Sequence, residues 1–282
     1  MNQSTKERHY KIIDNMCIMD DLMMSVFFTN RPECVEAILN AILPFKITVE
    51  KIDTQIEQKN GYGRNVTFDI LAKDENGKFY NIEVQRRSKG ASPKRARYHS
   101  SMIDTRALGH RQDYEELLDT YVVFITEHDV LKDDEPVYYI ERTVTKSNKL
   151  FNDGSHIIYL NTAYKKKEND NTSKELLDII HDIKCSNPAL MINKYLKARM
   201  EEIKSSESKE RDYMNKELRA YIDEILEEER EEMREEGRAE GIAEQAKKIA
   251  KNIPSSGEIT VDLIANLFGM TVEEFNALKA TV

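Results

Sequence analysis

The sequence has little cysteine and lacks the motifs of several common enzyme classes. Its three cysteines, Cys17, Cys34 and Cys185, lie far apart among 282 residues. An odd and sparse set of this kind excludes a disulfide framework and is typical of a reducing compartment. The sequence contains no Cys-x-x-Cys or His-x3-His pair, no Gly-rich phosphate loop and no Gly-x-Ser-x-Gly elbow. It therefore gives no support to a zinc site, to nucleotide hydrolysis or to serine chemistry.

Long apolar runs are also lacking. No hydrophobic stretch approaches the roughly 18 residues that a membrane-spanning helix requires. The first residues, MNQSTKERHYK, are too polar for a secretory signal. We therefore expect a cytoplasmic protein with no membrane partner. At this length the chain can bury a substantial core, and more than one domain is expected.

Charge is unevenly distributed along the chain. The net charge is −9 at pH 7, yet residues 84–111 hold eight basic residues against a single acid. Residues 221–245 show the opposite bias, with eleven acids and three arginines. The basic stretch is a candidate surface for nucleic acid, although basic residues on an ordinary solvated helix face would give the same pattern.

The stretch FDILAKDENGKFYNIEVQRR, residues 68–87, predicts a β-hairpin. Asp74 and Gly77 occupy the first and fourth positions of a type I turn, which those residues favour. A three-residue loop with Gly77 in the left-handed conformation then closes the hairpin with a bulge. This closure pairs residue 74 with residue 78 and fixes the register of both strands.

The register decides which polar side chains meet. With the three-residue loop, Asp69 lies opposite Glu83, and Thr67 lies opposite Gln85. A two-residue turn would instead place Asp69 opposite Val84 and scatter the polar set. Strand alternation then assigns the other face of the hairpin to apolar side chains: Phe68, Ile70, Tyr80, Ile82 and Val84.

Two facing carboxylates predict a cation site. They repel and destabilise the hairpin unless a positive charge joins them. Mg²⁺ accepts one or two carboxylates, retains several waters and takes phosphate oxygens. Asp69 and Glu83, with Gln85 two residues further on, are therefore candidate metal-binding residues. The alternative is an edge hairpin that shows a polar face to solvent, as antiparallel sheets commonly do.

The remaining patterns predict an α/β core with a mixed sheet flanked by helices. Ser92 and Pro93 suit the cap and first position of a helix of about 25 residues. The run TYVVFIT is typical of a strand buried on both faces. The other expected elements are two helices within 19–43, strands at 47–57, 66–73, 78–86, 136–144 and 156–163, and helices at 173–183 and 188–204.

The C-terminal part predicts a helical extension. A long acidic helix is expected at about 206–250, where the apolar seam Met214, Leu218, Ile222 and Ile225 gives way to glutamates. Such a helix protrudes as an arm or pairs with another chain. We divide the chain into a core (1–172), packing helices (173–205), the acidic arm (206–250) and a small helical segment (251–282).

The order helix, strand, acid-bearing hairpin, helix, buried strand is that of the PD-(D/E)XK nuclease core. Over nearly its whole length the chain resembles the bacterial PD-(D/E)XK nuclease family transposases, also called recombination-promoting nucleases. The stretches that carry the resemblance are MDDLMMSVFF, GRNVTFDILAKDENGKFYNIEVQRR, KRARYHSSMIDTRALG, YVVFITEHDVL, DGSHIIYLN and EEGRAEGIAEQ. The resemblance implies an endonuclease that acts on DNA with Mg²⁺, or with Mn²⁺ in its place.

The resemblance also implies roles for individual residues. Asp69 and Glu83 match the metal-binding acids of the family, and Asp21 matches the acid of the first helix, with Asp20 beside it. Gln85 stands where the wider superfamily has lysine, a charge that glutamine cannot supply. Glutamine is usual in this family, so it does not mark an inactive enzyme. Because glutamine is uncharged, we expect slow catalysis or a basic residue supplied from nearby, with Arg86 and Arg95 as candidates. The expected DNA contacts are Arg64, Arg86, Lys94, Arg95, Arg97 and Tyr98.

A rival hypothesis keeps the fold without the catalysis. The protein would then bind DNA, or a partner through its acidic arm. In the nuclease hypothesis the arm joins two copies into a homodimer that cuts both strands of a duplex.

Overall fold

The computed structural model describes residues 3–218 except 62, 87 and 169, together with residues 220, 221, 234 and 237. The chain divides into two compact units, Met1–Leu218 and Arg219–Val282. Most of the predicted arm, through which a homodimer is expected to form, lies outside the described residues. The segment 251–282 also lies outside them. The fold below is that of the first unit.

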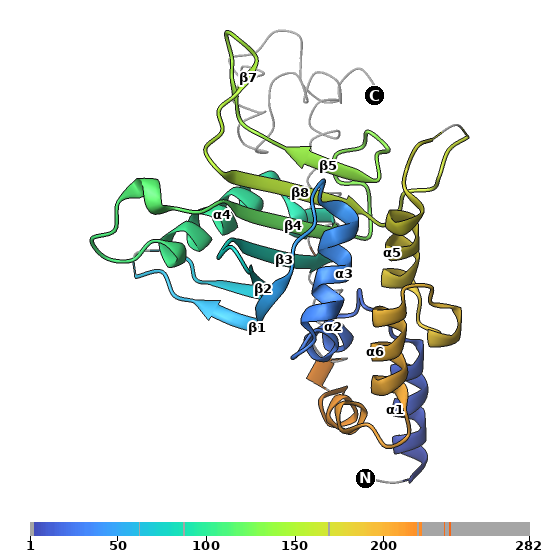
Figure 1. Cartoon of the computed structure of the whole chain (residues 1–282). Helices are drawn as coiled ribbons and strands as arrows, with labels where there is room; N and C mark the ends of the chain where they lie inside the picture. Colours follow the sequence, from blue (N-terminus) through green and yellow to red (C-terminus); the bar gives the residue numbers. More distant parts are fainter. Residues whose placement is uncertain are drawn as a thin grey trace, which may run out of the picture. The chain divides into compact units, whose positions relative to one another are not determined.

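A six-stranded mixed sheet forms its centre (Figure 1). The strands β3–β4 and β4–β8 pair in parallel, and the other neighbours are antiparallel. A separate two-stranded sheet joins β6 (Thr143–Val144) to β7 (Lys149–Leu150). The order across the main sheet is β1 (Val49–Gln58), β2 (Val66–Asp74), β3 (Phe79–Gln85), β4 (Thr120–Thr126), β8 (Ser155–Asn161) and β5 (Val137–Ile140).

Helices cover both faces of this sheet. Every residue of β4 is buried, as expected for a strand covered on both sides. The helix α4 (Pro93–Ala107) packs on β3, β4 and β8 over a cluster that includes Val66, Phe68, Leu71 and Phe124. On the opposite face Tyr80 stacks on Tyr121, with 4.7 Å between ring centroids.

The other helices form a layer beside β1. They are α1 (Gln3–Asn15), α2 (Asp21–Phe27), α3 (Pro32–Ile42), α5 (Lys174–Lys184) and α6 (Lys194–Lys204), with short 3₁₀ turns at η1 (Ser88–Ala91), η2 (Tyr114–Glu116) and η3 (Pro188–Leu190). The helix α3 packs against β1, α5 and α6. Residues 209–218 are also helical, with Met214 and Leu218 fully buried. They bind α1, where Tyr10 donates to Asp212 at 2.7 Å.

The predicted hairpin turn is confirmed. Gly77 has φ +83°, and its N–H donates to the Asp74 carbonyl at 3.0 Å. The Asp74 N–H donates to the Lys78 carbonyl at 3.1 Å, and Ile70 pairs with Ile82. The loop therefore has three residues, and the two-residue alternative is excluded.

Other predictions fail in instructive ways. The helix after Ser92 has 15 residues instead of 25, because Leu108 is extended and Arg111 has φ +73°. The helix expected at 188–204 begins only at Lys194, after a 3₁₀ turn. The strand expected at 136–144 is split between β5 and β6, and α1 was not anticipated at all.

Candidate functional site

The site forms where the pairing of β2 with β3 changes character. Main-chain pairing extends to Ile70 and Ile82. One residue further on, side-chain carboxylates accept the hydrogen bonds of the backbone N–H groups. The Asp69 N–H donates to Glu83 Oε1 at 3.3 Å, and the Val84 N–H donates to Asp69 Oδ2 at 3.0 Å. Backbone donors that would bind carbonyls in a regular ladder thus hold the two predicted acids.

The neighbouring strand is irregular at the same level. Gln55 lies between the pairs Thr54–Ile70 and Ile56–Phe68, which places it opposite Asp69. Its φ is +53°, a left-handed conformation that is uncommon for a residue other than glycine. The Gln55 amide approaches Asp69 Oδ1 at 3.5 Å.

The irregularity reverses the direction of the side chains along β2. Phe68 packs edge-on against His99 of α4 and belongs to the same cluster as Leu71. In a regular strand residues 68 and 71 would face opposite sides. The prediction that Phe68 shares a face with Ile70 and Tyr80 is therefore wrong, because it assumed an unbroken alternation through Asp69.

The Glu83 carboxylate is fully buried and, besides the Asp69 N–H, has two side-chain nitrogen neighbours. Arg95 Nη2 lies 3.0 Å from Oε2, and His99 Nδ1 lies 3.3 Å from Oε1. Arg95 Nε also donates to His99 Nε2 at 3.3 Å. The Asn81 amide nitrogen lies 3.0 Å from the same His99 Nδ1, so Asn81, His99 and Glu83 form one buried polar cluster.

Electrostatics at Asp69 favour a cation. Burial, followed by the charge of Glu83, raises the pKa of Asp69 from its ordinary 3.8 to about 8. The charge of Asp21 on α2 raises the pKa of Asp69 further, while the Val84 N–H and Arg95 oppose the shift. The charges of Glu83 and Asp21 thus both act on Asp69. The Asp20 carboxylate instead accepts from the Cys17 N–H at 2.8 Å and pairs with Arg86 at 2.5 Å.

Arg95 contacts the position where the superfamily has lysine. Its Nη1 donates to Gln85 Oε1 at 3.3 Å and to the Gly90 carbonyl at 3.0 Å. Gly90 is required for this packing, because a Cβ there would lie 2.0 Å from Gln85 Oε1. Arg86, the other candidate, donates to Glu127 at 3.2 Å. Of the two arginines, Arg95 is the one beside Gln85 and Glu83.

The predicted DNA contacts have different surroundings. Arg64, Lys94 and Arg97 are exposed, the last two on α4. The Tyr98 hydroxyl donates to the Arg64 carbonyl at 2.6 Å and accepts from Asn60 at 3.0 Å. Tyr98 therefore fixes the loop that carries Arg64.

Sequence reasoning missed His99 and Asn81 as members of this site. His99 is buried and contacts the predicted metal ligand Glu83. Two signals were available. His99 lies one helical turn after Arg95, and Asn81 lies two residues before Glu83 on the same strand face.

A hard divalent cation fits this donor set. Within the described ranges no three His, Cys, Asp or Glu side chains are grouped to hold a metal ion. Proteins nevertheless commonly bind Mg²⁺ through only one or two carboxylates, and water and phosphate oxygens complete its coordination shell. The raised pKa of Asp69 reports an uncompensated charge that a cation would neutralise.

Comparison with known proteins identifies the family. The model of the PD-(D/E)XK nuclease family transposases matches residues 31–252, which include Asp69, Glu83 and Gln85 but not Asp21. The chain therefore belongs to this family and has a nuclease-like function. Searches of curated proteins and of solved structures found no significant match. Among the described residues, no helix has the length and apolar character needed to cross a membrane.

Proposed function

We propose that this member of the PD-(D/E)XK nuclease family transposases is a divalent-metal-dependent endonuclease that hydrolyses phosphodiester bonds in DNA. The observation that carries the proposal is the pair Asp69 and Glu83, which backbone donors hold together where the β2–β3 pairing ends. Asp69 and Glu83 would bind Mg²⁺ or Mn²⁺. The bound ion would polarise the phosphate and lower the pKa of a bound water.

The surrounding residues have separate roles in this proposal. Gln85 orients the attacking water, and Arg95 supplies the positive charge that glutamine lacks. Asp21 adds negative charge beside Asp69 and strengthens its hold on a cation. Lys94, Arg97 and Arg64 would contact phosphates, which positions the DNA without reading its sequence. Arg86, which pairs with Asp20 and Glu127, and Tyr98, which holds the loop of Arg64, would position neighbouring residues.

The test is nicking of supercoiled plasmid by the purified full-length chain. Asp69→Ala and Glu83→Ala should each abolish the Mg²⁺-dependent activity, because the two acids act as a unit. DNA binding should remain, and Gln85→Ala should reduce activity more mildly. Asp53→Ala, on the neighbouring strand β1, is the matched control and should cut normally. Equal cleavage by the wild type and Asp69→Ala would show that another site or a contaminant is responsible.

A DNA-binding protein without catalysis is the second candidate. The observation that favours it is the ion pair between Arg95 and Glu83, which already neutralises one of the two acids. Calorimetric titration with MgCl₂ and MnCl₂ separates the candidates. Binding by the wild type that is lost in Asp69→Asn supports the nuclease. Absence of binding by the wild type, with retained affinity for DNA, supports the rival.

A further inference from the structure

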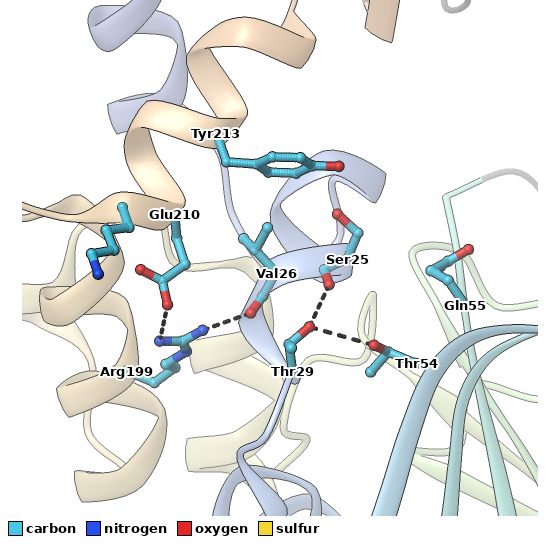
Figure 2. Close-up of a pocket in the computed structure, with 9 residues that line it drawn as sticks. Ser25, Val26, Thr29, Thr54, Gln55, Arg199, Glu210 and Tyr213 are labelled. Atoms are coloured by element: carbon cyan, nitrogen blue, oxygen red, sulfur yellow. Dashed lines mark hydrogen bonds and ion pairs between the residues drawn. The ribbon is translucent and has the colours of Figure 1, made fainter.

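A cavity of about 450 Å³ lies beside the candidate metal site. Five separate segments form its walls: α2, the turn after it, β1, α6 and the helical residues 209–218. Figure 2 shows the Tyr213 ring above Ser25 and Val26, with Thr54 and Gln55 of β1 on the other side. The lining residues are Ser25, Val26, Thr29, Thr54, Gln55, Arg199, Lys209, Glu210 and Tyr213.

Two of its walls connect directly to the proposed catalytic acids. Gln55 lines the cavity, and its amide approaches Asp69 Oδ1 at 3.5 Å. Ser25 follows Asp21 by one turn of α2, so the two side chains lie on the same helix face. The left-handed backbone of Gln55 holds its side chain at this junction. A DNA strand with its phosphate at Asp69 would therefore have an adjoining nucleotide at the cavity.

The buried cation of the walls, Arg199, is fully occupied by groups of the protein. Arg199 is buried, and its guanidinium donates to the carbonyls of Val26 and Phe27 at 2.7 and 3.0 Å. It also pairs with Glu210 at 3.2 Å and Glu202 at 2.9 Å. Its charge is therefore already matched by two carboxylates. Arg199 therefore forms a fixed part of the wall. An anion next to it would be repelled by the Glu210 carboxylate.

Apart from the exposed Lys209, the remaining lining groups are uncharged and suit a flat, polar ring. Thr29 Oγ1 donates to the Ser25 carbonyl at 2.9 Å, and Thr29 and Thr54 hydroxyls lie 3.4 Å apart. Hydroxyl and amide groups of this kind can both donate and accept. The Tyr213 side chain is half exposed and offers an aromatic face. Proteins that bind single-stranded nucleic acid use such aromatic faces to stack bases.

We infer that this cavity takes one unpaired nucleobase of the substrate strand, stacked on Tyr213, beside the phosphate that is cut. The inference rests on the proposed nuclease function and names its substrate class. A base inside a duplex is stacked on its neighbours and cannot place its face on Tyr213 without leaving the stack. The preferred substrate is then single-stranded or locally unpaired DNA.

The experiment compares Tyr213→Ala with the wild-type chain on a fluorescent single-stranded oligonucleotide and on the same sequence as a duplex. Base–aromatic stacking predicts that Tyr213→Ala loses between about fivefold and a hundredfold in single-strand affinity. The loss should be confined to the single strand, and Tyr213→Phe should recover most of it because the ring is kept. Tyr114→Ala, which removes a highly exposed ring outside the cavity, is the control for non-specific stacking.

A second measurement identifies the base. The cut position in the oligonucleotide is mapped, and an abasic nucleotide is then placed on either side of it. The wild type should lose cleavage at one of these positions, and Tyr213→Ala should lose little more there, since the two changes remove the same contact. Equal binding and cleavage by wild type and Tyr213→Ala would overturn the inference. Loss of single-strand affinity in Tyr213→Ala without any metal-dependent cleavage would overturn the proposed catalysis alone.

Discussion

Replacing Asp69 by asparagine should stabilise the metal-free protein at neutral pH. This is unusual for a partly buried polar group with a backbone hydrogen bond. Asparagine can still accept from the Val84 N–H but carries no charge to repel Glu83. The folded protein prefers a protonated Asp69, whereas the unfolded chain ionises it near its ordinary pKa of 3.8. Wild-type stability should therefore fall as pH rises from about 4 to about 8.

The magnitude follows from that difference in pKa. Each pH unit between the two pKa values shifts the free energy of unfolding by about 1.4 kcal/mol, which gives about 4 kcal/mol at pH 7 as an upper bound. Glu83 shares the repulsion, and partial exposure of Asp69 admits water. We therefore expect Asp69→Asn to gain about 1–2 kcal/mol, or about 2–8 °C in melting temperature for a chain of this size.

The assay is thermal unfolding in EDTA between pH 5 and 8.5. The difference in melting temperature should grow with pH and extrapolate to a constant offset near pH 4. Millimolar MgCl₂ should then raise the melting temperature of the wild type, because a ligand of the folded state stabilises by mass action. Asp69→Asn should gain little from the salt. Asp53→Asn, whose parent carboxylate pairs with Lys51 at 3.1 Å on β1, is the control.

Two results would refute the reasoning. A difference between wild type and Asp69→Asn that is the same at every pH would mean that the Asp69 carboxyl is not destabilised by its surroundings. Equal stabilisation of both proteins by MgCl₂ would place the cation elsewhere.

Two further predictions concern the groups that surround Glu83. Gly90→Ala should lower nicking activity by about tenfold, because the new Cβ displaces the flexible end of Gln85. The free energy of unfolding should change by no more than about 0.5 kcal/mol. Unchanged activity would show that the position of Gln85 is unimportant. Arg95→Ala should lower the free energy of unfolding in urea by about 2 kcal/mol at pH 7, because it leaves the buried Glu83 carboxylate without its partner. Arg95→Lys should restore part of that loss, and an unchanged urea midpoint in Arg95→Ala would show that His99 and the Asp69 N–H suffice.

Some features of the site could be predicted because they depend on local chemistry. The hairpin register follows from the turn, where Asp74 and Gly77 suit one loop length and no long-range contact is needed. The Ser92 cap is also local, and its side chain accepts from the Arg95 N–H as predicted. Once the register was known, the meeting of Asp69 and Glu83 followed from strand geometry.

Other features depend on contacts between distant segments. The polar helix α1 has no clear pattern of its own, and it is bound by residues 209–218 through contacts such as Arg211 to Asp14 at 2.8 Å. The reversal of side chains at Asp69 involves Gln55 on another strand, whose left-handed backbone has no signature in the sequence. The cavity draws on α2, β1 and α6, and α6 follows β1 by more than a hundred residues. Strand alternation and helical periodicity describe single elements, so they cannot predict contacts between elements that are distant in the sequence.

The break in the β2–β3 ladder accounts for the raised pKa of Asp69, because it holds this carboxyl beside Glu83. Because main-chain N–H groups hold Asp69 and Glu83, their carboxylates are in position before any cation binds. Holding two acids together in this way destabilises the metal-free protein, as in many functional sites. Gln55, which carries the irregularity on β1, approaches Asp69 and also lines the cavity. If the cavity takes a base, one local distortion places the metal ligands and the nucleotide subsite within reach of a single DNA strand.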